Sequence, residues 1–274
     1  MQKGLVCILC IIGFTLNWIS PSYTQETITI CGTGDSQELL RLLAIKFEQL
    51  NPDVRVVVPD SIGSSGGIKA TAKGKCDLGR VARTLKENEV DYGLFVMFFA
   101  KSPVVFFAND HLDSIPSLST NQILDIYSGK TGLWQDIGAA TGNIYVANRE
   151  PGDSSRSVIE KHLPGFKALA TFAGKTVYTT PETVETVLNY DGTIGYTSLS
   201  ALIGRDNCHI FQINGIQPDI SSVSDDSYTL VSPLGLVWRQ DAAAPALKFI
   251  DFLSTERAQK IMISSGTFPV SQKK

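Results

Sequence analysis

The sequence has few cysteines, and their placement excludes a disulfide framework. Of its five cysteines, Cys7 and Cys10 lie in an apolar N-terminal stretch, which leaves Cys31, Cys76 and Cys208. An odd number of cysteines does not form a fully paired framework. The sequence also has only three histidines, and no spacing among histidines and cysteines resembles a zinc site. We therefore expect neither a metal ion nor a cofactor.

Cys31 and Cys76 are also expected not to pair with each other. Cys31 ends a predicted strand over residues 27–31, and Cys76 directly precedes another over residues 77–81. If the two strands are parallel, the thiols lie at opposite ends of the sheet and are too far apart for a disulfide. The sequence thus predicts that both are buried as small apolar residues.

The chain has no excess of basic residues. It contains 24 Lys and Arg against 27 Asp and Glu, a formal net charge of −3. Nucleic acid binding normally requires a basic surface, so we exclude nucleic acid as a partner. A chain of this charge that binds a small anion must use local dipoles and one or two guanidinium groups.

Long apolar runs are scarce, and the run at the N-terminus has the features of a targeting signal. Lys3 is followed by apolar residues 5–12 and 14–19, and then by small and polar residues 20–24. This pattern predicts a secretory signal peptide over residues 1–24, cleaved near Thr24, with an uncleaved anchor as the alternative. In either case the rest of the chain is exported.

A second apolar run covers residues 94–108. It is interrupted by Lys101, Ser102 and Pro103. A polar break that includes proline predicts two buried strands in place of a membrane span.

The first third of the chain has an alternating α/β pattern. Its overall composition, 43% apolar and 19% charged, is that of a globular protein. Residues 27–31, 54–58 and 77–81 have strand patterns, and residues 38–50 and 68–73 between them have helical spacing. This order predicts a parallel, doubly wound sheet with helices on both faces.

The alternation restarts at about residue 108, which indicates a second α/β unit. Residues 120–127 and 154–163 have helical patterns, and residues 144–146 form a strand pattern between them. A further strand is predicted over residues 229–238, and residues 243–264 have helical periodicity.

Three short stretches rich in glycine and hydroxyl side chains each precede a predicted helix: residues 32–36, 63–67 and 152–156. The first N–H groups of a helix have no internal partner and carry the positive end of the helix dipole. Glycine allows close approach of the backbone, and hydroxyl groups add donors. Each stretch alone is also typical of ordinary helix capping. Together they predict one anion held by several helix N-termini.

An ordered series of motifs surrounds these stretches. The series comprises residues 32–36 (Gly-Thr-Gly-Asp-Ser), 51–52 (Asn-Pro), 63–70, 77–79 (Asp-Leu-Gly), 123–130, Trp134, 149–156 (Arg-Glu-Pro-Gly-Asp-Ser-Ser-Arg), 192–196 and 249–254. It resembles the substrate-binding proteins of phosphate-importing ABC transporters, within the type II periplasmic binding protein superfamily. The resemblance runs from Thr27 to Val270 in unbroken order.

The resemblance implies a two-lobed α/β fold with the second lobe inserted in the first, two crossover strands, and an oxyanion in the cleft. Lobe 1 would comprise residues 25–107 and 229–274, and lobe 2 residues 108–228. The ligand-binding residues carried over are Thr33, Gly34, Asp35, Ser64, Ser65, Arg83, Arg149, Gly152, Asp153, Ser154 and Ser155. The implied protein is a periplasmic monomer without enzymatic activity, and its partners are inorganic phosphate or a similar oxyanion and a membrane permease.

The chain departs from the family pattern at two kinds of position. The family commonly has Ser at the positions of Asp35 and Asp153, and small hydroxyl residues where this chain has Arg80, Val81 and Ala82. A carboxylate repels an anion unless it accepts a proton from it, and phosphate, unlike sulfate, keeps an O–H near neutral pH. We hypothesise that Asp35 first, and Asp153 second, select phosphate against sulfate. The alternative is that both only cap helices.

Arg149 and Arg156 are the candidates for gripping two oxygens of the anion at once. Arg149 is the preferred ligand residue, and Arg156 is expected to support the loop. Surface pairing or packing is the alternative for both.

Two other functions compete with this interpretation. Gly34-Asp35-Ser36 and the later Asp206–His209 segment resemble the Gly-Asp-Ser and Asp-x-x-His pair of a serine esterase family. In that family the His segment is near the C-terminus, whereas residues 210–274 follow it here. An exported phosphate sensor, or a binding protein for sulfate, molybdate or tungstate, would keep the same fold.

Overall fold

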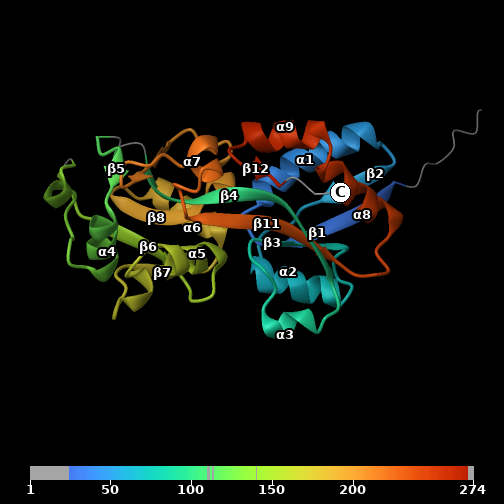
Figure 1. Cartoon of the computed structure of the whole chain (residues 1–274), viewed down its shortest axis with the longest axis horizontal. Coiled ribbons are helices and arrows are strands. Elements are labelled where there is room, and N and C mark those ends of the chain that lie inside the picture. The colour runs from blue at the N-terminus through green and yellow to red at the C-terminus, as the bar shows by residue number, and fades with distance from the viewer. Residues whose placement is uncertain (1–24, 110–111, 113, 140, 271–274) are drawn as a thin grey trace, which may run out of the picture.

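The computed structural model describes residues 25–109, 112, 114–139 and 141–270, and the predicted signal peptide lies outside this range. Figure 1 shows an elongated molecule of two lobes. Its elements are β1 (Glu26–Gly32), α1 (Gln37–Leu50), β2 (Val54–Val57), α2 (Gly63–Ala72), β3 (Leu78–Val81), α3 (Glu87–Val90), β4 (Phe95–Asn109), β5 (Ser117–Leu118), α4 (Thr120–Ser128), η2 (Trp134–Ile137), β6 (Tyr145–Arg149), α5 (Ser154–His162), η3 (Phe166–Ala168), β7 (Lys175–Val177), α6 (Thr180–Asn189), β8 (Thr193–Ser198), η4 (Leu199–Leu202), β9 (Cys208–Ile210), β10 (Gln212–Ile213), α7 (Ile220–Ser224), β11 (Val231–Trp238), α8 (Ala244–Leu253), α9 (Glu256–Ser264) and β12 (Phe268–Pro269).

The predicted parallel sheet is confirmed in the first lobe. β1 pairs in parallel with both β2 and β3, and the order of the main sheet is β2-β1-β3-β11-β4-β8-β6-β7. Helix α1 forms because its apolar residues repeat at helical spacing, and it buries Leu39, Leu43 and Phe47 against this sheet. Parallel strands place the loops that follow them at one edge of the sheet, where ligands bind in such folds.

The prediction of two strands over residues 94–108 is wrong, because β4 is one strand of 15 residues. It pairs antiparallel with β11 from Phe95 to Pro103 and with β8 from Val104 to Phe107. Pro103 lacks an N–H donor, and it lies between the residues that pair with β12 and those that pair with β8. The strand therefore continues through the proline without losing a pairing partner.

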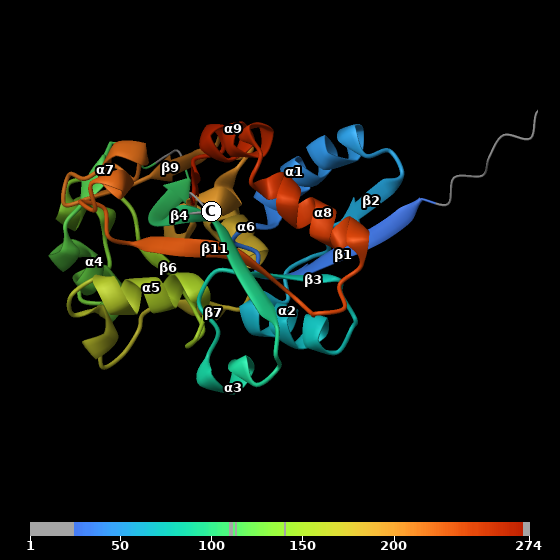
Figure 2. The same ribbon diagram turned by 45° about the vertical axis from the view of Figure 1, so that its right-hand side comes forward.

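The hydrophobic clusters on the two sides of this point are separate. One contains Phe99 and Ala100 of β4 together with α1, α8 and α9, and the other contains Val104 and Phe106 of β4 together with α4 and α5. β4 and β11 connect the two lobes, and Figure 2 shows both strands passing through the middle of the molecule. The predicted strand over residues 229–238 is thus the strand that carries the chain back. Within the described part of the chain, no helix combines the length and apolar character needed to cross a membrane.

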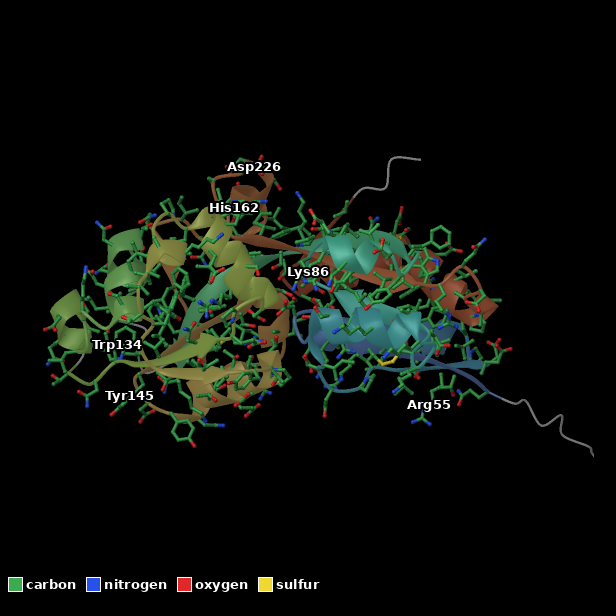
Figure 3. The ribbon with its side chains drawn as sticks, turned by 90° about the horizontal axis from the view of Figure 1, so that it is seen from below. Arg55, Lys86, Trp134, Tyr145, His162 and Asp226 are labelled. Carbon is green, nitrogen blue, oxygen red and sulfur yellow. A yellow bond between two sulfur atoms is a disulfide. The ribbon has the colours of Figure 1, made fainter. Side chains whose placement is uncertain are left out.

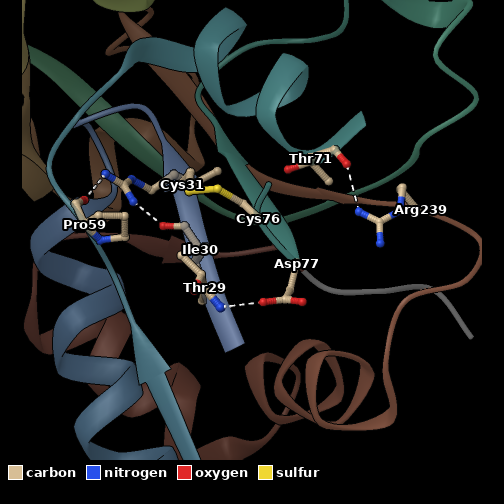
Figure 4. The surroundings of a disulfide bond; sticks show 9 residues. Thr29, Ile30, Cys31, Pro59, Thr71, Cys76, Asp77 and Arg239 are labelled. Atoms are coloured by element: carbon tan, nitrogen blue, oxygen red, sulfur yellow. Dashed lines mark hydrogen bonds between the residues drawn. A yellow bond between two sulfur atoms is a disulfide. The ribbon is translucent and has the colours of Figure 1, made fainter. Parts of the chain in front are cut away.

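The expectation that Cys31 and Cys76 cannot pair is wrong, because they form a disulfide with Cα atoms 6.1 Å apart (Figure 4). The strands are parallel, as expected, but β3 is shifted along β1, so that Leu78 pairs with Ile30. The turn before β3 also folds back onto β1, where Asp77 N–H donates to Thr29 O at 3.0 Å. This register brings the start of one strand beside the end of the other.

Reducing this disulfide is expected to lower the free energy of unfolding by about 2–4 kcal/mol, because the bridge restricts the unfolded chain across a separation of 45 residues. Denaturant unfolding of a Cys31→Ser/Cys76→Ser variant would measure the loss. Cys208→Ser, outside the disulfide, is the matched control. A double variant as stable as the parent would contradict the expectation.

Candidate functional site

The first predicted loop follows β1 and leads into α1. Thr33 N–H donates to Arg80 O at 3.1 Å, and Asp35 N–H donates to Thr33 Oγ1 at 3.3 Å. The residue before α1 is Ser36, whose side chain makes no capping hydrogen bond. A Cβ added to Gly34 would lie 2.5 Å from the Cβ of Thr180, so the glycine lets this loop touch α6 of the other lobe.

The second stretch was predicted to precede its helix, and this is wrong. It forms the first turns of α2, which begins at Gly63. Ser64 Oγ lies 3.1 Å from Ser154 Oγ, which belongs to the other lobe, and it accepts a hydrogen bond from Ala82 N–H at 3.2 Å. The second and third predicted stretches therefore meet face to face.

Arg83 is already engaged by a carboxylate. Its guanidinium donates to both oxygens of Glu89, at 2.7 and 2.8 Å, and to Ser65 Oγ at 2.7 Å. Burial would raise the pKa of Glu89, but the hydrogen bonds from Arg83 and from the backbone of Lys86 outweigh it and lower that pKa to about 2. The pair is thus ionised at neutral pH, and Glu89 neutralises the charge that Arg83 brings to the site.

The third stretch is organised by an ion pair between Arg149 and Asp153. Asp153 is the N-cap of α5, where Oδ1 accepts from Arg156 N–H at 2.9 Å, and Oδ2 lies 2.7 Å from Arg149 Nη2. Burial raises the pKa of Asp153 to about 6 although Arg149 opposes the shift. Both readings of Asp153 considered above are therefore compatible with its position, since it caps the helix and faces the guanidinium.

Arg149 is almost fully buried, and most of its donors are used. Nε donates to Val177 O at 3.2 Å, Nη2 to Tyr178 O at 3.3 Å, and Nη1 to Thr180 Oγ1 at 3.4 Å. Nη1 carries two hydrogens, and Thr180 is its one acceptor among the described residues. One N–H of the guanidinium is therefore available to an anion.

Asp35 is completely buried. Its Oδ1 accepts a hydrogen bond from Thr180 Oγ1 at 3.1 Å, and its Oδ2 has no partner among the described residues. Burial raises the pKa of Asp35, and the positive charge of Arg149 partly opposes the rise. A buried carboxylate oxygen without a donor is costly, so a protonated ligand group beside it would be stabilised.

A cavity of about 250 Å³ between the lobes brings most of the predicted residues together. Eight of them line it: Thr33, Ser64, Ser65, Arg83, Arg149, Gly152, Asp153 and Ser154. Gly34, Asp35 and Ser155 are not among the lining residues. Hydroxyl groups from both lobes and a guanidinium at one small cavity are suited to a tetrahedral oxyanion.

Sequence reasoning missed several residues of this cavity. The additional lining residues are Ser61, Ile62, Gly63, Lys86, Glu150, Pro151 and Thr180. Lys86 lies where the two lobes face each other (Figure 3). Thr180 begins α6, directly after its N-cap Thr179 and before Pro181, so a capping pattern was present in the sequence. Nothing in that pattern indicated contact with Asp35.

The arrangement required by the esterase interpretation is not formed. Ser36 is buried, and its Oγ has no hydrogen-bond partner among the described residues. His209 lies on β9 in the other lobe, and its Nε2 is 2.7 Å from Ile115 O. No Ser36–His209 hydrogen bond therefore activates this serine.

The chain is similar to known proteins in sequence and in fold. A family model described as the PBP superfamily domain matches residues 20–257. Phosphate-binding protein PstS of Bacillus subtilis (strain 168) is 25% identical over 257 residues, which cover 90% of this chain and 82% of that protein.

Two solved structures share the fold. A putative phosphate ABC transporter substrate-binding protein from Clostridium perfringens, with bound phosphate, superposes with a TM-score of 0.79 at 25% identity, over 90% of this chain and 100% of that one. An ABC-type phosphate transport receptor from Vibrio cholerae gives a TM-score of 0.62 at 24% identity, over 88% and 99% of the two chains. With the family model spanning most of the sequence and both lobes of the fold in place, the chain belongs to the PBP superfamily.

Proposed function

We propose that this protein binds inorganic phosphate between its lobes and delivers it to an ABC importer. The observation that carries the proposal is the cavity at which Ser64 and Ser154 meet from opposite lobes beside Arg149. The similarity to the phosphate-bound protein of Clostridium perfringens supports phosphate as the anion. Binding in such a cavity needs no catalytic group, so the proposed protein is not an enzyme.

The proposed ligand residues differ in the kind of hydrogen-bond donor that they provide to the anion. Thr33, Ser64, Ser65 and Ser154 supply hydroxyl groups at the cavity, and Gly152 lines it in a loop where a ligand can approach the backbone closely. Gly34 and Ser155 do not line the cavity and are proposed to contribute donors from behind it. Arg149 supplies the charged donor. Arg83 is proposed to act with Glu89 as a neutral pair that holds Ser65, because its charge is already matched.

Asp35 is proposed to select the protonated anion. Oδ2 is buried and unpartnered and does not line the cavity, so the proposal requires that the lobes rearrange to let the anion reach it; Oδ2 then accepts the proton of phosphate, whereas sulfate offers none and is repelled. Asp153 has its oxygens engaged by Arg149 and Arg156, so the structure supports Asp35 more strongly for this role.

The lobe boundaries, the cellular location and the protein partner are also proposed. We infer a division into residues 25–107 with 229–274 and residues 108–228, which the separate hydrophobic clusters on the two halves of β4 support. A disulfide in the described chain supports an exported, periplasmic protein. We propose a monomer that docks on a membrane permease; recovery of no permease in a pull-down would favour the phosphate sensor instead.

Calorimetric titration of the mature protein against phosphate, sulfate, molybdate and tungstate tests the central proposal. We expect saturable binding of phosphate and much weaker binding of sulfate. Tighter binding of molybdate or tungstate would reassign the ligand to that oxyanion. Absence of heat with all four anions would contradict oxyanion binding itself.

A further inference from the structure

Arg80 is a fully buried arginine on β3 that the proposed binding role does not use. Its guanidinium donates to four oxygens from three separate segments: Thr33 O at 2.5 Å, Pro59 O at 2.7 Å, Gln37 Oε1 at 3.0 Å, and Ile30 O. Every nitrogen of the side chain therefore has an acceptor.

None of these acceptors is charged. Among the described residues, no carboxylate lies within ion-pair distance of Arg80. Glu38 and Asp60, the acidic groups whose charges act on Arg80, are paired with Arg41 at 2.7 and 3.2 Å. Burial lowers the pKa of Arg80 to about 10, which still leaves it protonated at neutral pH. A buried, unneutralised charge is unfavourable, so its presence calls for a compensating role.

The acceptors of Arg80 belong to the two segments of the first lobe that contribute to the cavity, the loop with Thr33 and the segment that leads to Ser61 and Gly63. Thr33 belongs to the first loop and lines the cavity, and Gln37 is the first residue of α1. Pro59 lies in the segment that leads into α2, whose first turn carries Ser64. One planar guanidinium thus joins the two segments that must keep a fixed spacing around an anion.

The backbone around Arg80 is fitted to the same contact. Arg80 O accepts the N–H of Thr33, and a Cβ added to Gly32 would lie 2.1 Å from Arg80 O and 2.8 Å from Arg80 Cγ. Gly32 has φ of +143°, a conformation that side chains rarely adopt. The loop can therefore lie directly on Arg80 only because residue 32 is glycine.

We infer that Arg80 is a positioning residue of the anion site. It fixes the first loop relative to the start of α2, and it places an unneutralised positive charge directly behind Thr33. The inference concerns the phosphate site and so rests on the proposed function for its binding readout, but not for its structural readout.

The test compares two variants. Arg80→Met removes both the charge and the planar set of N–H donors, whereas Arg80→Lys keeps only the charge. We expect Arg80→Met to weaken phosphate binding at least tenfold and to remove part of its salt dependence, and Arg80→Lys to weaken binding less and to retain the salt dependence. Arg239→Met is the matched control, because Arg239 also donates to a backbone oxygen, Thr71 O at 3.0 Å, yet does not line the cavity.

Hydrogen–deuterium exchange separates positioning from general stability. Faster exchange confined to residues 33–37 and 59–65 in Arg80→Lys supports the inference. Uniformly faster exchange along the chain, or phosphate affinity within twofold of the parent in a folded Arg80→Met protein, would overturn it. If the parent binds none of the tested oxyanions, the proposed function fails, and the exchange pattern of Arg80→Lys still decides whether Arg80 holds the two segments.

Discussion

Replacing Arg149 by methionine is expected to weaken phosphate binding by at least about 100-fold, because a buried charged donor to the anion is lost. The carboxylates of Asp153 and Glu150 would also lose the cation with which they pair. Calorimetry would measure the affinity. Arg205→Met, in the same lobe but in an exposed pair with Glu185, is the control and should leave binding unchanged. Near-normal affinity of a folded Arg149→Met protein would remove Arg149 from the site.

The same variant has a predictable pH dependence of stability. In the parent, burial raises the pKa of Asp153 from 3.8 to about 6, so the folded state holds this proton more tightly than the unfolded state. The resulting stabilisation is full below pH about 4 and is lost as the pH rises through about 6. Without Arg149 the pKa of Asp153 should rise further, so the loss of stability should extend to higher pH. Thermal unfolding from pH 5 to 8 would show this as a steeper decline than in the parent.

Replacing Asp35 by asparagine is expected to reduce the preference for phosphate over sulfate by about 10- to 100-fold. The neutral amide removes the repulsion of sulfate and can donate a hydrogen bond to it, while the acceptor for the phosphate proton becomes weaker. Competition between the two anions, followed by calorimetry, would give the ratio. Asp136→Asn, on the surface of the second lobe, is a matched control.

The pH dependence of this preference follows from the state of Asp35. Burial raises its pKa, and only the ionised form rejects sulfate, so the preference should be greatest at high pH and decline as the pH falls through the raised value. If Asp35→Asn leaves the phosphate-to-sulfate ratio unchanged, Asp35 serves only to hold Thr180 across the lobes.

Much of the secondary structure could be predicted because local patterns are strong in this chain. The alternation of residues 26–81 gives the parallel strands, and the helix at residues 120–128 has a capping box at Ser119 and a left-handed glycine at Gly129. The periodicity over residues 243–264 is divided into α8 and α9, because Thr255 caps a new helix by accepting from Ala258 N–H. The apolar pattern alone does not show this division, since it continues across the two caps, Ser254 and Thr255.

The prediction of one strand or two over residues 94–108 depended on partners distant in sequence. Pro103 is a valid reason to end a strand when the strand stands alone. β4 continues because β11 pairs with it from Phe95 to Pro103. The N–H group that proline lacks is not needed for the hydrogen bonds to β11. A similar dependence on register explains the error at Cys31 and Cys76, since the offset of β3 along β1 decides which ends of the strands are neighbours.

The sequence by itself determined the class of fold, the order of its elements and the three stretches that supply six of the eight predicted cavity residues, the other two being Arg83 and Arg149. Hydrophobic spacing, capping residues and glycine act over a few positions, so a linear pattern contains them. Only the tertiary structure decided that Thr180 bridges Asp35 and Arg149, that Glu89 neutralises Arg83, and that Arg80 joins two loops through backbone oxygens. These contacts join residues from different elements, and their physical basis is the burial of charge, which has no local signature in the sequence.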